Sequence, residues 1–209
     1  MTPPPDAGNR RALIVVDVQR DFCPGGALPA PGCERILPAI NRYLAEAQEL
    51  SMPVYASRDW HPAITKHFRA FGGRWPPHCV QGSFGAEFHP ALNLPASATI
   101  VSKGDAPERE GYSAFDGHAP DGRTLLEDLR VRHVNTLYVT GIATDYCVKH
   151  TAIDALQAGL HVIVLTDAIA GIDVQPGDVD RALTEMSRAG AEMASSLGVI
   201  RTGSAERSA

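Results

Sequence analysis

Short apolar runs alternate along the chain with segments whose apolar residues have helical spacing. Residues 12–16 form a continuous apolar run, which is typical of a central strand buried on both faces. Further strands are predicted at residues 54–57, 98–102, 136–140 and 161–166. Strands that alternate with helices form a parallel sheet with helices on both faces. We therefore predict an α/β protein, a three-layer α/β/α domain with a central, mostly parallel sheet of about six strands.

Helical spacing is clearest after the first strand. Apolar residues recur every four positions from Ile36 to Leu44, which predicts a helix over residues 34–50. The remaining elements are helices over residues 123–133, directly after Cys147 and over residues 179–193, and a short sixth strand at residues 198–201. Together with the strands, these elements complete a repeating strand–helix order.

The composition is that of one globular domain. Residues 11–202 contain no repeat or linker, so we expect a single domain with flexible tails at residues 1–10 and 203–209. The chain has 19 Lys and Arg against 24 Asp and Glu, a net charge of −5, and no basic cluster. Nucleic acid and anionic membrane surfaces are therefore not expected partners. Its longest apolar runs are about five residues, against the ~20 that a membrane-spanning helix needs.

Two features bear on location. Arg10 and Arg11 precede the first apolar run, but the run stops at Asp17, too early for the apolar core of an export signal. The four cysteines, at positions 23, 33, 79 and 147, show no C-x-x-C spacing. We therefore expect reduced thiols in a cytoplasmic protein.

Polar residues of several chemical types follow the predicted strands. In parallel sheets, ligands bind outside the carboxyl ends of the strands, and Asp17, Asp59, Lys103 and Cys147 all fall at or just after such ends. Cys147 is expected in the first turn of a helix, where free N–H groups and the helix dipole favour a thiolate. Each residue alone has a structural explanation: a small buried side chain, a turn cap, a solvated strand end. Together they supply a nucleophile, a base and a cation.

The segment from residue 58 to about residue 95 is too long for a simple connection, which favours a functional role. It contains Asp59, His61, His67 and His78. One carboxylate with two or three imidazoles is a ligand set for a divalent transition metal and leaves positions open for water or substrate. Solvated loop histidines are the alternative. Because three of the eight histidines lie within eighteen residues, we favour the metal site.

Five motifs carry a resemblance to a known family. They occur at residues 16–22 (VDVQRDF), 57–62 (SRDWHP), 75–82 (WPPHCVQG), 102–104 with 112–115 (SKG and YSAF) and 141–148 (GIATDYCV). In content and order they resemble the nicotinamidases, or pyrazinamidases, of the isochorismatase-like cysteine hydrolase superfamily. The resemblance spans residues 11–202.

The resemblance implies roles for individual residues. Asp17, Lys103 and Cys147 would form the catalytic triad. One divalent transition metal ion (zinc, iron or manganese) would be bound by three further residues, Asp59, His61 and His78, with His67 as a further ligand. Many relatives have Asn or Asp directly before this histidine and Ser soon after it, whereas this chain has Lys66 before His67 and Phe68 and Arg69 after it. The resemblance therefore leaves open whether His67 binds the metal or only its water.

The resemblance also implies the shape of the substrate site. A cis peptide bond between Ile142 and Ala143 would direct the N–H groups of Ala143 and Cys147 into an oxyanion hole. The residues expected around a flat pyridine ring are Phe22, Leu28, Trp75, Tyr112 and Ile142. For Phe22 and Trp75, the alternative is that they anchor loops to the core.

The implied activity is hydrolysis of nicotinamide to nicotinate and ammonia through a thioester, as part of NAD salvage, with pyrazinamide as a further substrate. The implied partner is this small molecule, and the implied assembly is a monomer or homodimer. Three alternatives remain. The first is a related amide or carbamoyl hydrolase, whose relatives typically lack the metal residues. The second is isochorismatase chemistry, which needs no cysteine. The third is a ligand-binding module without catalysis.

Overall fold

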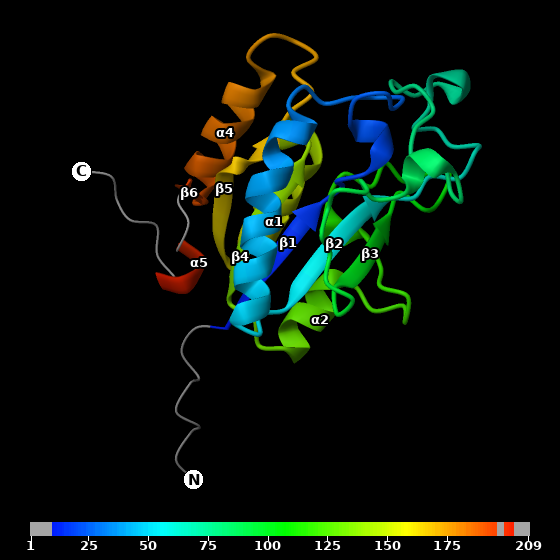
Figure 1. Ribbon diagram of the computed structural model, residues 1–209. Helices are drawn as coiled ribbons and strands as arrows, with labels where there is room; N and C mark the ends of the chain where they lie inside the picture. Colours follow the sequence, from blue (N-terminus) through cyan, green and yellow to red (C-terminus); the bar gives the residue numbers. More distant parts are fainter. Residues whose placement is uncertain (1–9, 196–198, 203–209) are drawn as a thin grey trace.

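The computed structural model describes residues 10–195 and 199–202, and the predicted tails lie outside this range except for Arg10. The chain forms a six-stranded sheet in the order β3-β2-β1-β4-β5-β6, and every adjacent pair is parallel (Figure 1). The strands are β1 (Arg11–Val16), β2 (Val54–Asp59), β3 (Thr99–Lys103), β4 (Thr136–Ile142), β5 (His161–Ala170) and β6 (Glu192–Ala194). The predicted parallel α/β sheet is confirmed.

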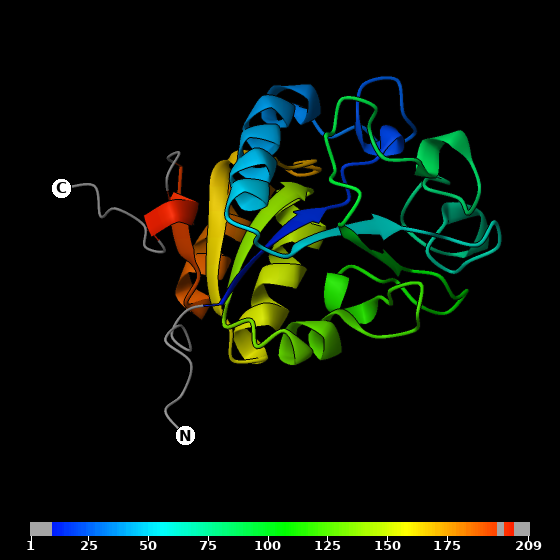
Figure 2. The same cartoon turned by 60° about the horizontal axis from the view of Figure 1, so that its bottom comes forward.

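Helices cover both faces of the sheet, as the turned view shows (Figure 2). They are α1 (Cys33–Glu49), α2 (Leu125–Val131), α3 (Lys149–Gln157), α4 (Asp178–Ala189) and α5 (Val199–Thr202). Leu13 and Val15 of β1 pack in one core with α1 and α5, whereas Ile14 and Val16 pack in a second core with α2, α3 and α4. Because strand side chains alternate between faces, one continuously apolar strand serves two cores.

The end of the chain differs from the prediction. Helix α4 stops at Ala189 because Gly190 takes a left-handed conformation (φ 112°), which ends the helix. The next residues form β6, so residues 192 and 193 belong to the sixth strand and not to the helix. The predicted strand at 198–201 is wrong: residue 198 lies outside the described range, and Val199–Thr202 is helical.

The prediction of four free thiols is also wrong. Cys23 follows the 3₁₀ turn η1 (Arg20–Phe22), and Cys33 is the first residue of α1. The chain folds back between them, and the two cysteines are joined by a disulfide with their Cα atoms 5.3 Å apart. Cys79 and Cys147 are free and buried.

The long connection from β2 to β3 lies beyond the carboxyl ends of these strands (Figure 1). Two short 3₁₀ turns, η2 (Arg69–Phe71) and η3 (Phe84–Ala86), are its regular elements. An isolated pairing of His61 with Val80 joins two parts of this connection, and a pairing of Phe88 with Gln19 joins it to the segment that follows β1. In the described part of the chain, none of the helices has the length and apolarity of a transmembrane span.

Candidate active site

The four polar residues predicted at strand ends come together on four adjacent strands. Asp17 directly follows β1, Asp59 ends β2 and Lys103 ends β3, while Cys147 follows β4. Asp59 and Lys103 are paired in register across β2 and β3. All four side chains are enclosed, since Asp17 and Lys103 have no exposed surface, and Asp59 and Cys147 expose 4% and 6%. The predicted convergence on one edge of the sheet is confirmed.

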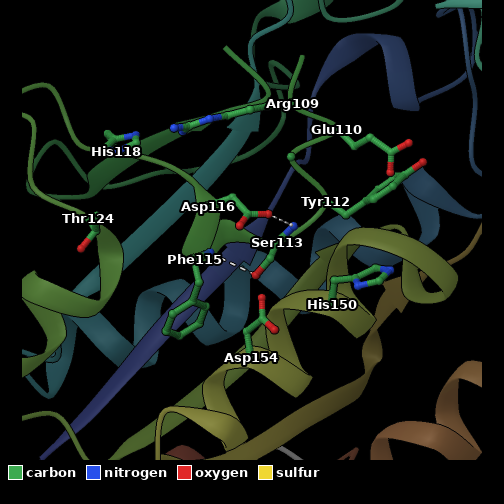
Figure 3. Close-up of a pocket in the computed structure, with 11 residues that line it drawn as sticks. Arg109, Glu110, Tyr112, Ser113, Phe115, Asp116, His118, Thr124, His150 and Asp154 are labelled. Carbon is green, nitrogen blue, oxygen red and sulfur yellow. Dashed lines mark hydrogen bonds between the residues drawn. The ribbon is translucent and has the colours of Figure 1, made fainter. Parts of the chain in front are cut away.

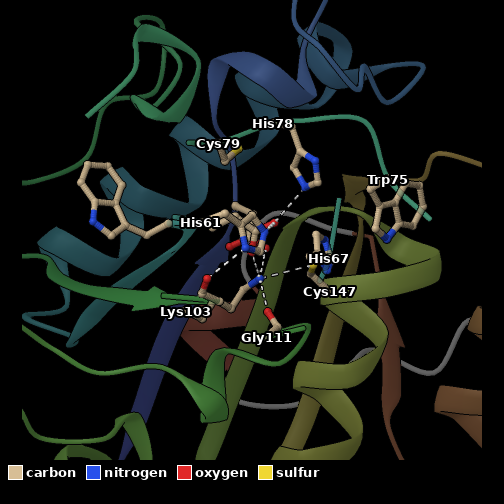
Figure 4. A network of polar contacts seen from close by, with 12 residues as sticks. His61, His67, Trp75, His78, Cys79, Lys103, Gly111 and Cys147 are labelled. Carbon is tan, nitrogen blue, oxygen red and sulfur yellow. Dashed lines mark hydrogen bonds and ion pairs between the residues drawn. The ribbon is translucent and has the colours of Figure 1, made fainter. Parts of the chain in front are cut away.

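Lys103 is the centre of this group (Figure 4). Its Nζ lies 2.7 Å from Asp17 Oδ2, 2.5 Å from Asp59 Oδ1 and 3.4 Å from Cys147 Sγ. It also donates a hydrogen bond to the carbonyl of Gly111 at 2.9 Å. One ammonium therefore contacts both carboxylates and the thiol at once.

Burial and neighbouring charge set the protonation of the group. Burial raises the pKa of Asp17, and Lys103 opposes this effect only in part. Burial acts in the same direction on Asp59, but Lys103, His61 and His78 outweigh it, so the pKa of Asp59 lies well below its ordinary value. Burial acts to lower the pKa of Lys103, yet the two carboxylates raise it well above its ordinary value. Asp17 is thus the carboxyl group suited to accept a proton.

Cys147 lies in a tight turn between β4 and α3. The turn, Thr144–Val148, is π-helical, and the peptide bond before it, Ile142–Ala143, is cis as expected. Gly141 has a φ of 110°, and a Cβ there would lie 2.0 Å from the carbonyl oxygen of Val16. Only glycine therefore allows the backbone of β4 to approach β1 this closely with this φ.

The expected lowering of the Cys147 pKa is wrong. Burial raises the pKa of the thiol well above its ordinary value; Lys103 counteracts this, but Asp17 and Asp59 add to it. The helix start favours the thiolate, but burial and the two nearby carboxylates outweigh that effect on the pKa of Cys147. The ligand atoms of Asp17, Asp59 and Cys147 lie within 4.8 Å of one another, so the proton has a short path from sulfur to Asp17.

The three predicted metal-binding histidines form a second group beside Asp59. One ring nitrogen from each of His61, His67 and His78 lies within 4.8 Å of the others, and all three side chains are buried. The rings of His61 and His67 are stacked with centroids 4.4 Å apart. Burial lowers the pKa of His67 to about 3, which keeps its ring neutral and able to act as a ligand. His67 therefore lies with the other two histidines, and not apart from them.

The donor atoms fit a metal ion. Nδ1 of His61 lies 3.0 Å from the carbonyl of Gly104, and Nδ1 of His78 lies 2.8 Å from that of Pro76. A carbonyl only accepts, so each Nδ1 carries the proton and each Nε2 offers a lone pair. These Nε2 atoms lie 3.6 Å and 3.8 Å from Asp59 Oδ2. Nε2 of His61 is buried and has no hydrogen-bond partner among the described residues, so its lone pair is free to bind a cation.

Three of the predicted substrate-binding residues, Phe22, Trp75 and Tyr112, have ring contacts with the histidine group. Trp75 donates from Nε1 to the hydroxyl of Tyr112 at 2.9 Å, and Phe22 packs against His78 with ring centroids 5.4 Å apart. Ile142 is buried in the core that includes Phe22, and Leu28 packs against that core. Phe22 and Trp75 expose 4% and 5% of their surface, so both also act as the loop anchors of the alternative interpretation.

Several neighbours of the site had no assigned role in the sequence analysis. Ser57 donates to Asp17 Oδ1 at 2.7 Å, and the amide of Gln19 holds both the N–H and the carbonyl of Asp59 at 2.8 Å. Tyr146 packs edge-on against Trp75 at 4.9 Å. Ser57, Gln19 and Tyr146 all lie within the recognised motifs, which is the one signal that could have identified them.

Tyr112 also lines a hollow of about 530 Å³ (Figure 3). Its walls come from the segment 109–118 and from His150 and Asp154 of α3, and the rings of Tyr112 and His150 are stacked 5.3 Å apart. It contains none of the triad or metal-binding residues. The side chains of Asp17, Asp59, Lys103 and Cys147 are buried and are not among those that line this hollow.

Comparison with known proteins gives consistent matches. Residues 11–196 match the isochorismatase domain family. The nicotinamidase of Escherichia coli (strain K12) is 42% identical over 199 residues, covering 88% of this chain and 93% of that protein. The nicotinamidase/pyrazinamidase of Mycobacterium tuberculosis is 43% identical over 186 residues, covering 88% and 97%. The fold resembles the crystal structure of a pyrazinamidase of Pyrococcus horikoshii in complex with zinc, with a TM-score of 0.82, 45% identity and coverage of 90% and 99%.

Proposed function

This chain belongs to the isochorismatase family, and on that premise we propose that it is a metal-containing cysteine amidohydrolase. Its reaction is the conversion of nicotinamide to nicotinate and ammonia, and pyrazinamide is a second substrate. The observation that carries the proposal is the joining of two groups through Asp59. One oxygen of Asp59 contacts Lys103 of the triad, and the other faces His61 and His78.

Asp17 and Cys147 carry out the first half of the reaction. The raised pKa of Cys147 keeps the proton on sulfur until substrate is bound, and the raised pKa of Asp17 prepares it to accept that proton. Sulfur then forms a bond to the carboxamide carbon. The negative charge on the amide oxygen is held by the N–H groups of Ala143 and Cys147, each worth about 3–4 kcal/mol in such a role.

Lys103 and Asp17 complete the turnover. The carbon–nitrogen bond breaks as protonated Asp17 returns its proton to the departing ammonia, which leaves a thioester on Cys147. Water then attacks the thioester carbon while Asp17 takes a proton from that water. The carbon–sulfur bond breaks, Asp17 returns this proton to the sulfur of Cys147, and the released nicotinic acid ionises to nicotinate. Lys103 holds Asp17 in place at 2.7 Å throughout and remains charged because its pKa is raised.

Asp59, His61, His67 and His78 would hold one divalent transition metal ion, zinc, iron or manganese. When bound, such an ion acts as a Lewis acid that can take up the pyridine nitrogen and so orient the ring. Phe22, Trp75 and Tyr112 would line the flat space for the ring; Phe22 contacts His78, and Trp75 donates a hydrogen bond to Tyr112. Leu28 and Ile142, which belong to the same core as Phe22, would complete its wall. This orientation directs the carboxamide toward Cys147.

The test is ammonia release from purified protein loaded with zinc. We expect rapid release from nicotinamide and pyrazinamide and little from N-carbamoylsarcosine, which has no ring nitrogen to orient. Turnover of N-carbamoylsarcosine in preference to nicotinamide would assign the carbamoyl hydrolase alternative. Zinc binding without ammonia release from any of the three would contradict the proposed catalysis.

A further inference from the structure

Asp21 contacts the metal-binding loop although it belongs to a distant part of the sequence. It lies in η1, the turn after β1, whereas His78 and Cys79 belong to the connection between β2 and β3. Asp21 Oδ2 accepts a hydrogen bond from the N–H of Cys79 at 2.7 Å. This N–H belongs to the peptide that joins Cys79 to His78, so the Asp21 carboxylate holds the backbone of a proposed metal ligand.

The backbone at Cys79 needs such support. Cys79 has a φ of 45°, in the left-handed region that non-glycine residues seldom adopt. Its N–H is held by Asp21, and its carbonyl accepts from the N–H of His61 at 3.0 Å. Asp21 therefore acts on two ligands, on His78 through the shared peptide and on His61 through the carbonyl of Cys79.

The second oxygen of Asp21 is also in use. Oδ1 accepts from the N–H of Ala27 at 3.2 Å, which closes the loop that begins at η1. The site is also tightly filled, since a Cβ on Gly85 would lie 2.1 Å from Asp21 Oδ2. Two N–H groups face two different oxygens, so only a carboxylate satisfies both. An asparagine has one acceptor and would direct its own NH₂ at the other N–H.

We propose that Asp21 is a positioning residue for the metal site, which fixes the peptide between His78 and Cys79 so that the imidazoles of His78 and His61 meet beside Asp59. Phe22, the next residue, adds a ring contact to His78 at 5.4 Å. The inference rests on the metal site of the proposed function. It adds a residue of η1 that touches neither metal nor substrate.

The test compares zinc affinity in Asp21→Asn with that in a matched control, Asp145→Asn. Asp21 is half-buried and Asp145 is buried, but Asp145 likewise accepts two backbone N–H groups, from Ile172 at 3.0 Å and from Asp173 at 2.8 Å, on the nucleophile side of the site. The Kd for zinc is measured by competition with a chromophoric chelator. We expect Asp21→Asn to raise it about 10- to 100-fold and Asp145→Asn to leave it within about threefold.

Activity at excess zinc distinguishes a positioning role of Asp21 from a general structural defect of the variant. In Asp21→Asn, saturating zinc should restore most of the nicotinamide turnover, which a merely structural defect would not allow. Gly85→Ala is a second variant that keeps Asp21 and displaces its carboxylate, and it should weaken zinc binding in the same direction. An unchanged zinc Kd in folded Asp21→Asn, or an equal loss in Asp145→Asn, would overturn the inference. Absence of zinc binding by the unmodified protein would instead overturn the metal site itself.

Discussion

Two ionic clusters lie near opposite ends of the sheet and use the same kinds of residue differently. At the carboxyl ends of the strands, Lys103 contacts two carboxylates, and all three side chains are sealed from solvent. Near the amino ends, the buried carboxylate of Asp128 accepts from the Tyr55 hydroxyl at 2.7 Å and from Arg123 and Arg132 at 2.6 and 2.7 Å. These two arginine side chains are 47% and 46% exposed.

The two clusters differ in how completely their polar atoms have hydrogen-bond or charge partners. Asp128 has a partner on each oxygen, and its arginines keep contact with water, so it has nothing left to bind. The Lys103 cluster has two carboxylates for one cation and borders Nε2 of His61, which has no hydrogen-bond partner among the described residues. Such a cluster can accept a proton or a cation. Surplus negative charge and an unsatisfied acceptor, more than burial alone, distinguish this end of the sheet.

The largest effect is expected from Cys147→Ala. Removing the proposed nucleophile should lower the rate of ammonia release from nicotinamide at least about a thousandfold. Zinc content, measured by elemental analysis, should stay unchanged because no metal-binding residue is touched. Residual turnover near the original rate would show that the reaction does not use this thiol.

Lys103→Met should damage activity and stability together. It leaves Asp17 and Asp59 buried without their common cation, which costs about 3–5 kcal/mol of unfolding free energy, and it should lower kcat at least about 100-fold. Urea unfolding at pH 7 and ammonia release measure the two effects. Lys149→Met is the matched control, since Lys149 pairs with the exposed Glu185 at 3.1 Å and such a pair contributes about 1 kcal/mol or less. Equal losses of unfolding free energy and of kcat in both variants would show that the buried Lys103 cluster depends on its lysine no more than the exposed pair does.

Asp128→Asn should affect stability alone. The amide cannot accept from all three donors, so we expect a loss of about 1–3 kcal/mol in unfolding free energy and a kcat/KM within about twofold of the original. A larger fall in kcat/KM would mean that the Asp128 cluster affects the active site.

The pH dependence of that variant gives a finer test. Burial acts to raise the pKa of Asp128, but Tyr55, Arg132 and Arg123 outweigh it, so the folded-state pKa lies below the ordinary value. A lowered pKa stabilises the fold above the unfolded-state pKa, near 4, and this contribution is lost as the pH falls through the folded-state pKa. The difference in unfolding free energy between the original protein and Asp128→Asn should therefore be constant at neutral pH and shrink below about pH 4.

Much of the site was predictable because it depends on chain order. Asp17, Asp59, Lys103 and the turn before Cys147 each follow an apolar strand, and parallel strands place their carboxyl ends at one edge. The histidines were predictable as ligand types within one connection. The errors at residues 192–193 and 199–201 arose because short segments suit either a helix or an edge strand. At residues 192 and 193, Gly190 decided the outcome by ending α4.

The sequence by itself determined the parallel α/β architecture, the edge of the sheet that carries the chemistry and the residue types of the triad and metal group. These follow from periodicity and from polar residues at strand ends. Only the tertiary structure decided that Lys103 joins Asp17 to Asp59, that Cys23 and Cys33 pair, and that the Cys147 pKa is raised and not lowered. A pKa and a shared ion pair depend on burial and on the distances between segments far apart in the chain, which no local pattern records.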